Sequence, residues 1–271
     1  FNSGLKVKCL DTEFVPIELD YFADDYKYDR FVYALGNNCN VFYDKDNVEI
    51  QTTHVPYFVQ HRLKTNDKMA IKFEDLITNP IITLKRIHTE MQKELGRWEA
   101  DFDKRNSTLT ANGVRQFSNE IAAFKIEITR FATGIELLGK YNMLGDAFRY
   151  MNQAVRDSAK SKGYDSWRLF QVVFIVSLIL DVVAHEQDLM LDDDIKSKAK
   201  TDDVDILYFP TGGGKTEAFL GILVFNLFFD RLRGKSYGVT AMLKYPLRLL
   251  SVQQVQRVAN ILAAAEIIRQ T

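Results

Sequence analysis

A glycine run between an apolar segment and a long helical pattern constrains this chain more than any other feature of its sequence. Residues 204–209 (VDILYF) favour a β-strand, because β-branched and aromatic side chains suit a pleated surface. Residues 210–216 (PTGGGKT) follow at once, and residues 217–232 repeat apolar positions at helical spacing. A strand, a glycine-rich loop and a helix in this order are the setting of a phosphate-binding P-loop.

The residue types in the loop suit the phosphates of a nucleotide. Consecutive glycines let backbone N–H groups converge on phosphate oxygens, and the helix N-terminus adds partial positive charge. We expect Lys215 to reach the β- and γ-phosphates of ATP and the Thr216 hydroxyl to coordinate Mg²⁺, which makes both catalytic residues. The strict pattern GxxxxGK[ST] would require glycine at Phe209, so the loop departs from it there. The expected ATP-binding segment comprises Thr211, Gly212, Gly213, Gly214, Lys215, Thr216 and Glu217.

The net charge, the cysteines and the apolar runs indicate which partners and which cellular location to expect for the chain. The formal net charge is −1, so no overall basic field marks a nucleic-acid binder, although a balanced protein can still carry a basic groove. Cys9 and Cys39 form no metal-binding cluster in the sequence and predict a reduced, cytoplasmic chain. The longest apolar run, residues 172–180, is too short to span a bilayer, so no membrane partner is expected.

The rest of the sequence predicts an α/β chain in two parts. Residues 1–160 are expected to form a mixed, then mainly helical, N-terminal domain, and residues 161–271 the start of a P-loop domain with a parallel sheet. A hairpin is predicted over 41–50 and a second parallel strand over 237–243. Helices are predicted over 54–64, 81–95, 117–138, 146–159, 167–184, 217–232 and 252–269.

These motifs together resemble the first RecA-like domain of superfamily 2 helicases. The glycine loop has the form found there, and residues 246–253 (PLRLLSVQ) are similar to the helicase motif PTRxLxxQ, with Leu247 in place of threonine. Within that superfamily the chain resembles the helicase subunits of DISARM anti-phage systems, of the DrmA type. The resemblance extends over residues 131–254 and is carried by 131–138, 147–152, 167–171, 208–221 and 245–254.

The resemblance implies an ATP-dependent helicase or translocase in an anti-phage defence system. It implies nucleic acid as a partner, with DNA favoured over RNA, and other subunits of the defence system as further partners. It also implies that Arg248 and Gln253 contact the phosphate backbone of one strand, which fits an arginine beside a helix N-terminus. A structural ion pair of Arg248 is the alternative. The Arg-x-Phe-Gln segment ending at Gln171 implies that this glutamine binds adenine, whose N6 and N7 an amide can pair with. The alternative is a polar residue on an amphipathic helix.

The superfamily's Asp-Glu box, its arginine finger and its second RecA-like domain are missing from the residues before Thr271. We therefore expect an N-terminal fragment of the motor that is inactive alone, since ATP hydrolysis needs these parts. A different class of function stays open as well. A P-loop signalling or scaffold ATPase, whose helical N-terminus binds protein partners, would show no dependence on nucleic acid.

Overall fold

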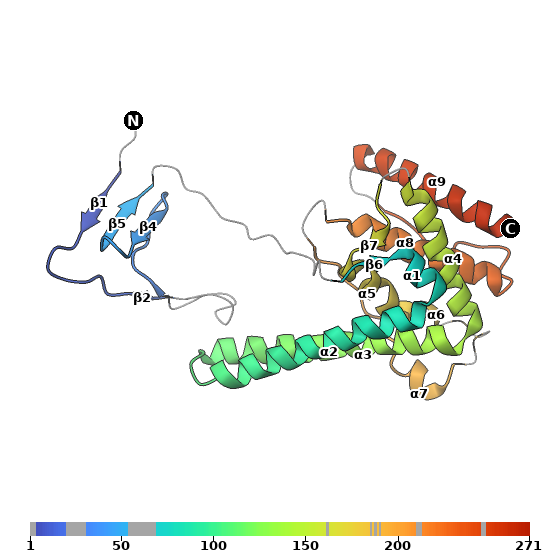
Figure 1. Ribbon diagram of the computed structural model, residues 1–271, viewed down its shortest axis with the longest axis horizontal. Coiled ribbons are helices and arrows are strands. Elements are labelled where there is room, and N and C mark those ends of the chain that lie inside the picture. The colour runs from blue at the N-terminus through green and yellow to red at the C-terminus, as the bar shows by residue number, and fades with distance from the viewer. Residues whose placement is uncertain are drawn as a thin grey trace. The chain divides into compact units, whose positions relative to one another are not determined.

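The computed structural model describes residues 4–19, 31–53, 69–160, 163–184, 186, 189, 191–209, 213–244 and 248–271, without the side chains of 248–251. The chain divides into two compact units (Figure 1). The first comprises Phe1–Arg62 and Arg97–Ala123, and the second comprises Leu63–Gly96 and Phe124–Thr271.

Small antiparallel sheets make up the strand part of the first unit. Strand β5 (Glu49–Thr52) lies between β1 (Lys6–Lys8) and β4 (Val41–Asp44), whereas β2 (Ile17–Glu18) pairs with β3 (Phe31–Val32). The hairpin predicted over 41–50 is thus confirmed. Its turn is closed by the Asp44 carboxylate, whose Oδ1 accepts hydrogen bonds from the backbone N–H groups of Asp46 (3.0 Å) and Asn47 (3.2 Å).

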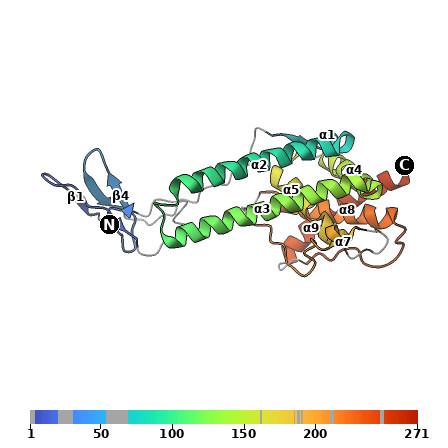
Figure 2. The same ribbon diagram turned by 90° about the horizontal axis from the view of Figure 1, so that it is seen from below.

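Two long helices form an antiparallel hairpin in which they run side by side (Figure 2). Helix α2 (Pro80–Arg105) begins at a proline, which suits the first turn because its missing N–H has no partner there in any case. Helix α3 (Ala111–Lys140) follows and carries the predicted apolar stripe. Toward the connection between the helices, Phe102 and Phe117 meet edge to face with ring centroids 5.4 Å apart. Both helices are confirmed and are longer than predicted.

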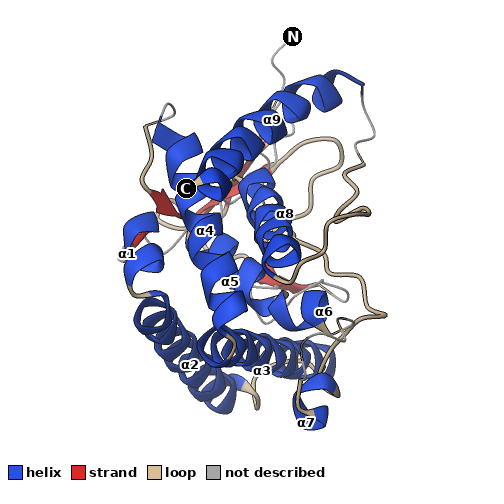
Figure 3. Cartoon of the chain, turned by 90° about the vertical axis from the view of Figure 1, so that its right-hand side faces the viewer, coloured by secondary structure: helices blue, strands red, loops and turns tan. Residues whose placement is uncertain are grey.

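The second unit is mainly helical around one apolar core. Helix α4 (Asn142–Ala159) packs against both α8 (Lys215–Leu232) and α9 (Arg248–Gln270) (Figure 3). Phe148, Met151 and Phe225 from these helices are at most 1% exposed. The remaining elements of the unit are β6 (Ile71–Lys72), α1 (Phe73–Thr78), β7 (Ser166–Trp167), α5 (Leu169–Ser177), α6 (Ile179–Val183) and α7 (Asp193–Lys196).

Two predicted strands are wrong. Residues 204–209 and 237–243 are described and form no strand, and Val204 and Tyr237 are 86% and 90% exposed. A strand depends on hydrogen bonds and side-chain contacts from a neighbour, so β-propensity alone does not form one. The sheets among the described residues are small and antiparallel, and no parallel sheet occurs there.

Two further predictions differ from the structure or fall outside it. The single helix expected over 167–184 begins later and is divided at Leu178 into α5 and α6, while Trp167 lies in β7. The helix expected over 54–64 lies outside the described residues. Among the helices that the structure does describe, none has the length and apolar character needed to cross a membrane.

Candidate functional site

The predicted phosphate-binding loop, residues 210–216 and called the phosphate loop below, meets helix α8 at a glycine whose conformation other residues rarely adopt. Gly214 has a φ of +86°, in the left-handed region, and is the N-cap of α8. A Cβ atom added there would lie 2.8 Å from Nε2 of Gln171. Lys215 is the first residue of α8, and Thr216 and Glu217 follow in its first turn, all three half-buried. Two other predicted residues of the loop, Thr211 and Gly212, lie outside the described residues.

Two side chains at the start of α5 hold carbonyl groups of this loop. Arg168 Nη1 donates a hydrogen bond to the Gly213 carbonyl oxygen at 2.6 Å, and Gln171 Nε2 donates one to the Gly214 carbonyl oxygen at 2.7 Å. Gln171 Oε1 in turn accepts a hydrogen bond from the Arg168 backbone N–H at 2.8 Å. Gln171 is only 4% exposed, so these bonds are shielded from water and fix its amide.

Anchoring the carbonyls also orients the N–H groups of the loop. In a planar trans peptide the C=O and the N–H of the next residue point in opposite directions. The bonds to the Gly213 and Gly214 carbonyls therefore turn the N–H groups of Gly214 and Lys215 away from α5. Together with the N-terminus of an 18-residue helix, they suit an anion such as phosphate.

The Lys215 ammonium donates a hydrogen bond to the backbone carbonyl of Phe209, at the near end of the same loop. The Phe209 ring stacks on Phe170, with centroids 4.0 Å apart and planes at 15°. This stacking links the segment before the loop to α5. Within the part of the chain that the structure describes, the charge of Lys215 is met by a carbonyl dipole and pairs with no carboxylate, which leaves it available to an incoming anion.

Close packing against α5 sets the position of α8. A Cβ atom on Gly221 would lie 2.5 Å from Cδ1 of Ile175 and 3.1 Å from the Trp167 ring, so glycine permits the close approach of the helices. Trp167 is itself fixed, since its Nε1 donates a hydrogen bond to Oδ1 of the fully buried Asn152 at 2.7 Å. The rigid support of the phosphate loop therefore comes from α4, β7 and α5.

A buried carboxylate organises the other end of α8. Asp230 is 5% exposed and accepts hydrogen bonds from Arg233 (3.0 Å), Lys235 (2.7 Å) and Thr240 (2.6 Å). Burial alone would raise the pKa of Asp230, but these hydrogen bonds outweigh it and lower the pKa. Arg233 also pairs with Glu186 at 2.7 Å. This cluster fixes the turn after α8 and the start of the segment that leads to α9.

The second predicted motif is described in part. Arg248 is the first residue of α9, at a helix N-terminus as expected, but its side chain is not described, and Pro246 lies outside the described residues. Gln253 lies one turn further along and is exposed. The structure thus places both predicted nucleic-acid contacts in the N-terminal part of one helix.

Sequence reasoning missed two residues of this region. Arg168 belongs to the Arg-x-Phe-Gln segment, but nothing in that segment indicates that the Arg168 side chain contacts the loop. Arg257 on α9 forms an ion pair with Glu217 in the first turn of α8. It lies in an ordinary helical pattern, so nothing in the sequence points to a partner 40 residues away.

Comparison with known proteins supplies a relative. No family model matches the chain. It is 36% identical over 169 residues to the DISARM protein DrmA of Bacillus paralicheniformis. The chain is a relative of DrmA. The match covers 53% of this chain but 14% of that DrmA, so the chain spans only a small part of the curated relative's length.

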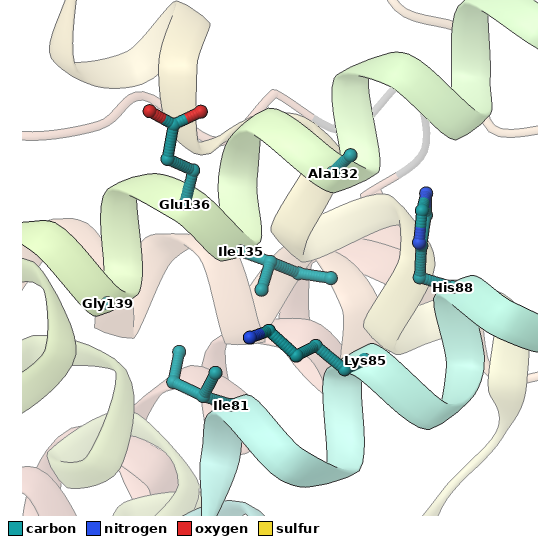
Figure 4. A pocket seen from close by; sticks show the side chains of 7 residues that line it. All are labelled: Ile81, Lys85, His88, Ala132, Ile135, Glu136 and Gly139. Carbon is teal, nitrogen blue, oxygen red and sulfur yellow. The ribbon is translucent and has the colours of Figure 1, made fainter.

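The DrmA-related chain also has a groove unconnected with the phosphate loop. A cavity of about 370 Å³ opens between α2 and α3 (Figure 4). It exists because Ala132 and Gly139 on α3 are small, and the Lys85 side chain extends along it between Ile81 and Ile135. Its lining is completed by His88 and Glu136. No residue predicted to bind nucleotide or nucleic acid lines this groove.

Proposed function

We propose that this chain carries the nucleotide-binding part of an ATP-dependent helicase or translocase in a DISARM anti-phage system. One observation carries the proposal. The glycine loop enters α8 at Gly214 with its carbonyls held by Arg168 and Gln171, which directs backbone N–H groups toward the space beyond the helix N-terminus. The identity to DrmA agrees with this assignment.

The residues at the loop fit ATP with Mg²⁺. Lys215 exchanges the Phe209 carbonyl for the β- and γ-phosphates, since a phosphate is the stronger acceptor for an ammonium group. The Thr216 hydroxyl and the loop segment 211–217 complete the site, and Gln171 is the candidate for adenine. When bound, the metal neutralises the charge that develops on the transferred phosphate. This chain's own residues bind and orient the phosphates.

The finer features of the motor belong to the same proposal. Residues 161–271 are the N-terminal part of a RecA-like P-loop domain. Arg248 and Gln253 on α9 contact the backbone of a nucleic-acid strand, for which DNA is the first candidate. Other DISARM subunits are the expected partners, and the cytoplasm is the expected location. Hydrolysis requires parts of the motor outside this sequence, so the chain alone is expected to be inactive.

ATP turnover by the longest natural protein that contains this chain tests the proposal. We expect Mg²⁺-dependent ATPase activity that rises several-fold when single-stranded or double-stranded DNA is added. ATPase activity that is indifferent to DNA and to RNA would instead support a signalling or scaffold ATPase. Absence of ATP binding in a folded protein would refute both functions.

A further inference from the structure

We propose that the ion pair between Glu217 and Arg257 couples the phosphate loop to helix α9, so that nucleotide and nucleic acid strengthen each other's binding. The inference rests on the proposed function and adds a positioning residue, Arg257, to it. Glu217 lies two residues after Lys215 in the first turn of α8, and Arg257 lies on the helix that begins at Arg248.

The contacts of Arg257 connect the first turn of α8 to the N-terminal half of α9. Arg257 Nη2 pairs with Glu217 Oε1, and Arg257 Nη1 donates a hydrogen bond to Gln254 Oε1 at 3.4 Å. Gln254 is the neighbour of Gln253, one of the predicted nucleic-acid contacts. The side chains of Arg257 and Glu217 are 29% and 20% exposed, so bulk water screens the pair only in part.

Helix α9 is held unevenly along its length. Ile261 and Ala265 in its C-terminal half are 4% and 9% exposed within the core, whereas Val252 and Val255 in its N-terminal half are both 66% exposed. Arg257 lies between these two regions. Val252 and Val255, the described apolar side chains nearest Gln253, therefore bury little surface, and this part of α9 can change its position at small energetic cost.

Electrostatics gives the pair a direct response to nucleotide. Phosphates bound at the start of α8 bring negative charge to the turn that already carries the Glu217 carboxylate. Like charges repel, so the positive charge of Arg257 stabilises this turn more strongly when phosphate is bound than when it is absent. The neighbouring Tyr164 reports a shielded setting, because burial, followed by the charge of Glu217, raises its pKa. Nucleotide thus favours the position of α9 in which the pair is formed.

Linkage makes the effect reciprocal. If nucleotide favours one position of α9 and nucleic acid binds best to that position, each ligand tightens the other by the same factor. Arg257 contributes through α9 and touches neither ligand in this account. Its loss should therefore change the coupling between the ligands more than the affinity for either ligand alone.

A binding cycle on the full-length protein tests this inference. The dissociation constant of a fluorescein-labelled single-stranded DNA is measured with and without Mg²⁺ and a non-hydrolysable ATP analogue, and their ratio is the coupling factor. We expect a wild-type factor within the roughly 5- to 150-fold range typical of allosteric coupling. Arg257→Gln should bring it close to one, and Arg257→Lys should retain part of it. The double variant Glu217→Gln, Arg257→Gln should show a coupling factor no smaller than that of the single variant Arg257→Gln.

Arg269→Gln is the matched control, because Arg269 lies on the same helix but pairs with Glu266 one turn before it. It should keep the wild-type factor. A normal factor in Arg257→Gln together with a lower melting temperature would show that the pair only braces the fold and would overturn the inference. Wild-type protein that binds both ligands independently would overturn it while leaving the proposed function intact, and protein that binds neither would defeat both.

Discussion

The side-chain amide of Gln171 donates a hydrogen bond to the carbonyl oxygen of Gly214 across 2.7 Å, joining the start of α5 to the last glycine of the phosphate loop. The oxygen of this Gln171 amide accepts a hydrogen bond from the backbone N–H of Arg168. An amide has two N–H groups and two lone pairs, so half of its capacity remains for adenine. Because Gln171 is 4% exposed, such a contact requires the surroundings to open.

Gln171→Ala separates these two roles. We predict a loss of the preference for ATP over GTP if the amide binds adenine, in addition to a weaker affinity for both nucleotides because the loop loses an anchor. Competition binding with ATP and GTP gives both quantities. If the affinities for ATP and for GTP fall by the same factor, Gln171 holds the loop but does not bind adenine.

Lys215→Ala should reduce ATP binding and ATPase activity of the full-length protein to background. Lys215 is the cation that the structure places at the N-terminus of α8, and removing it leaves the β- and γ-phosphates without that charge. Lys93→Ala is a suitable control, because Lys93 pairs with Glu90 on the exposed surface of α2. Wild-type ATPase activity in Lys215→Ala would end the P-loop assignment.

Arg248→Ala should weaken nucleic-acid binding about equally for all sequences and lower the salt slope by roughly one, since a phosphate contact carries no sequence information. ATP affinity measured without nucleic acid should persist, because the proposed function has the phosphates of ATP bound at α8 and not at α9. Filter binding at several salt concentrations measures the slope, and a melting curve accompanies it. An unchanged slope with a lower melting temperature would indicate that Arg248 braces the helix.

Gly134→Ala should lower the free energy of unfolding by about 1–3 kcal/mol. A Cβ atom at this position of α3 would lie 2.1 Å from the backbone oxygen of Val176 on α5, which cannot move aside as a side chain can. Gly96→Ala on α2 is the matched control, since no described atom outside the adjoining backbone of α2 lies within 4 Å of the added atom. It should stabilise the protein by about 0.5–1 kcal/mol, because alanine has the higher helix propensity. Urea unfolding of both variants compares them, and equal effects would contradict the packing argument.

Asp230 should make the free energy of unfolding depend on pH in the acidic range. Its folded-state pKa is lowered, so its contribution is fully present above the unfolded pKa of about 4 and is lost as the pH falls through the folded value. We expect Asp230→Asn to lower the free energy of unfolding by about 1–3 kcal/mol at pH 7. The difference from wild type should shrink below about pH 4. A difference that is constant between pH 3 and pH 7 would exclude a role for the charge.

Helices were predictable here because their pattern is local. The stripe from Phe117 to Leu138 and the helix after Lys215 each repeat apolar residues every three or four positions, and both formed. Residues 204–209 have an equally clear strand composition but formed none, because a strand depends on a partner from elsewhere in the chain. For the same reason the loop and Gln171 could be singled out from the sequence, whereas the pairing of Arg257 with Glu217 could not.

The segment before the phosphate loop has a practical consequence for handling the protein. Val204, Ile206 and Tyr208 are 86%, 84% and 86% exposed, while Asp205 between them pairs with Arg130 at 2.8 Å. Apolar side chains that alternate along backbone without strand pairing are a template on which one molecule can add to another. The isolated 271-residue chain should therefore self-associate as its concentration rises, slowed by acids such as Asp202 and Asp203 that act as gatekeepers.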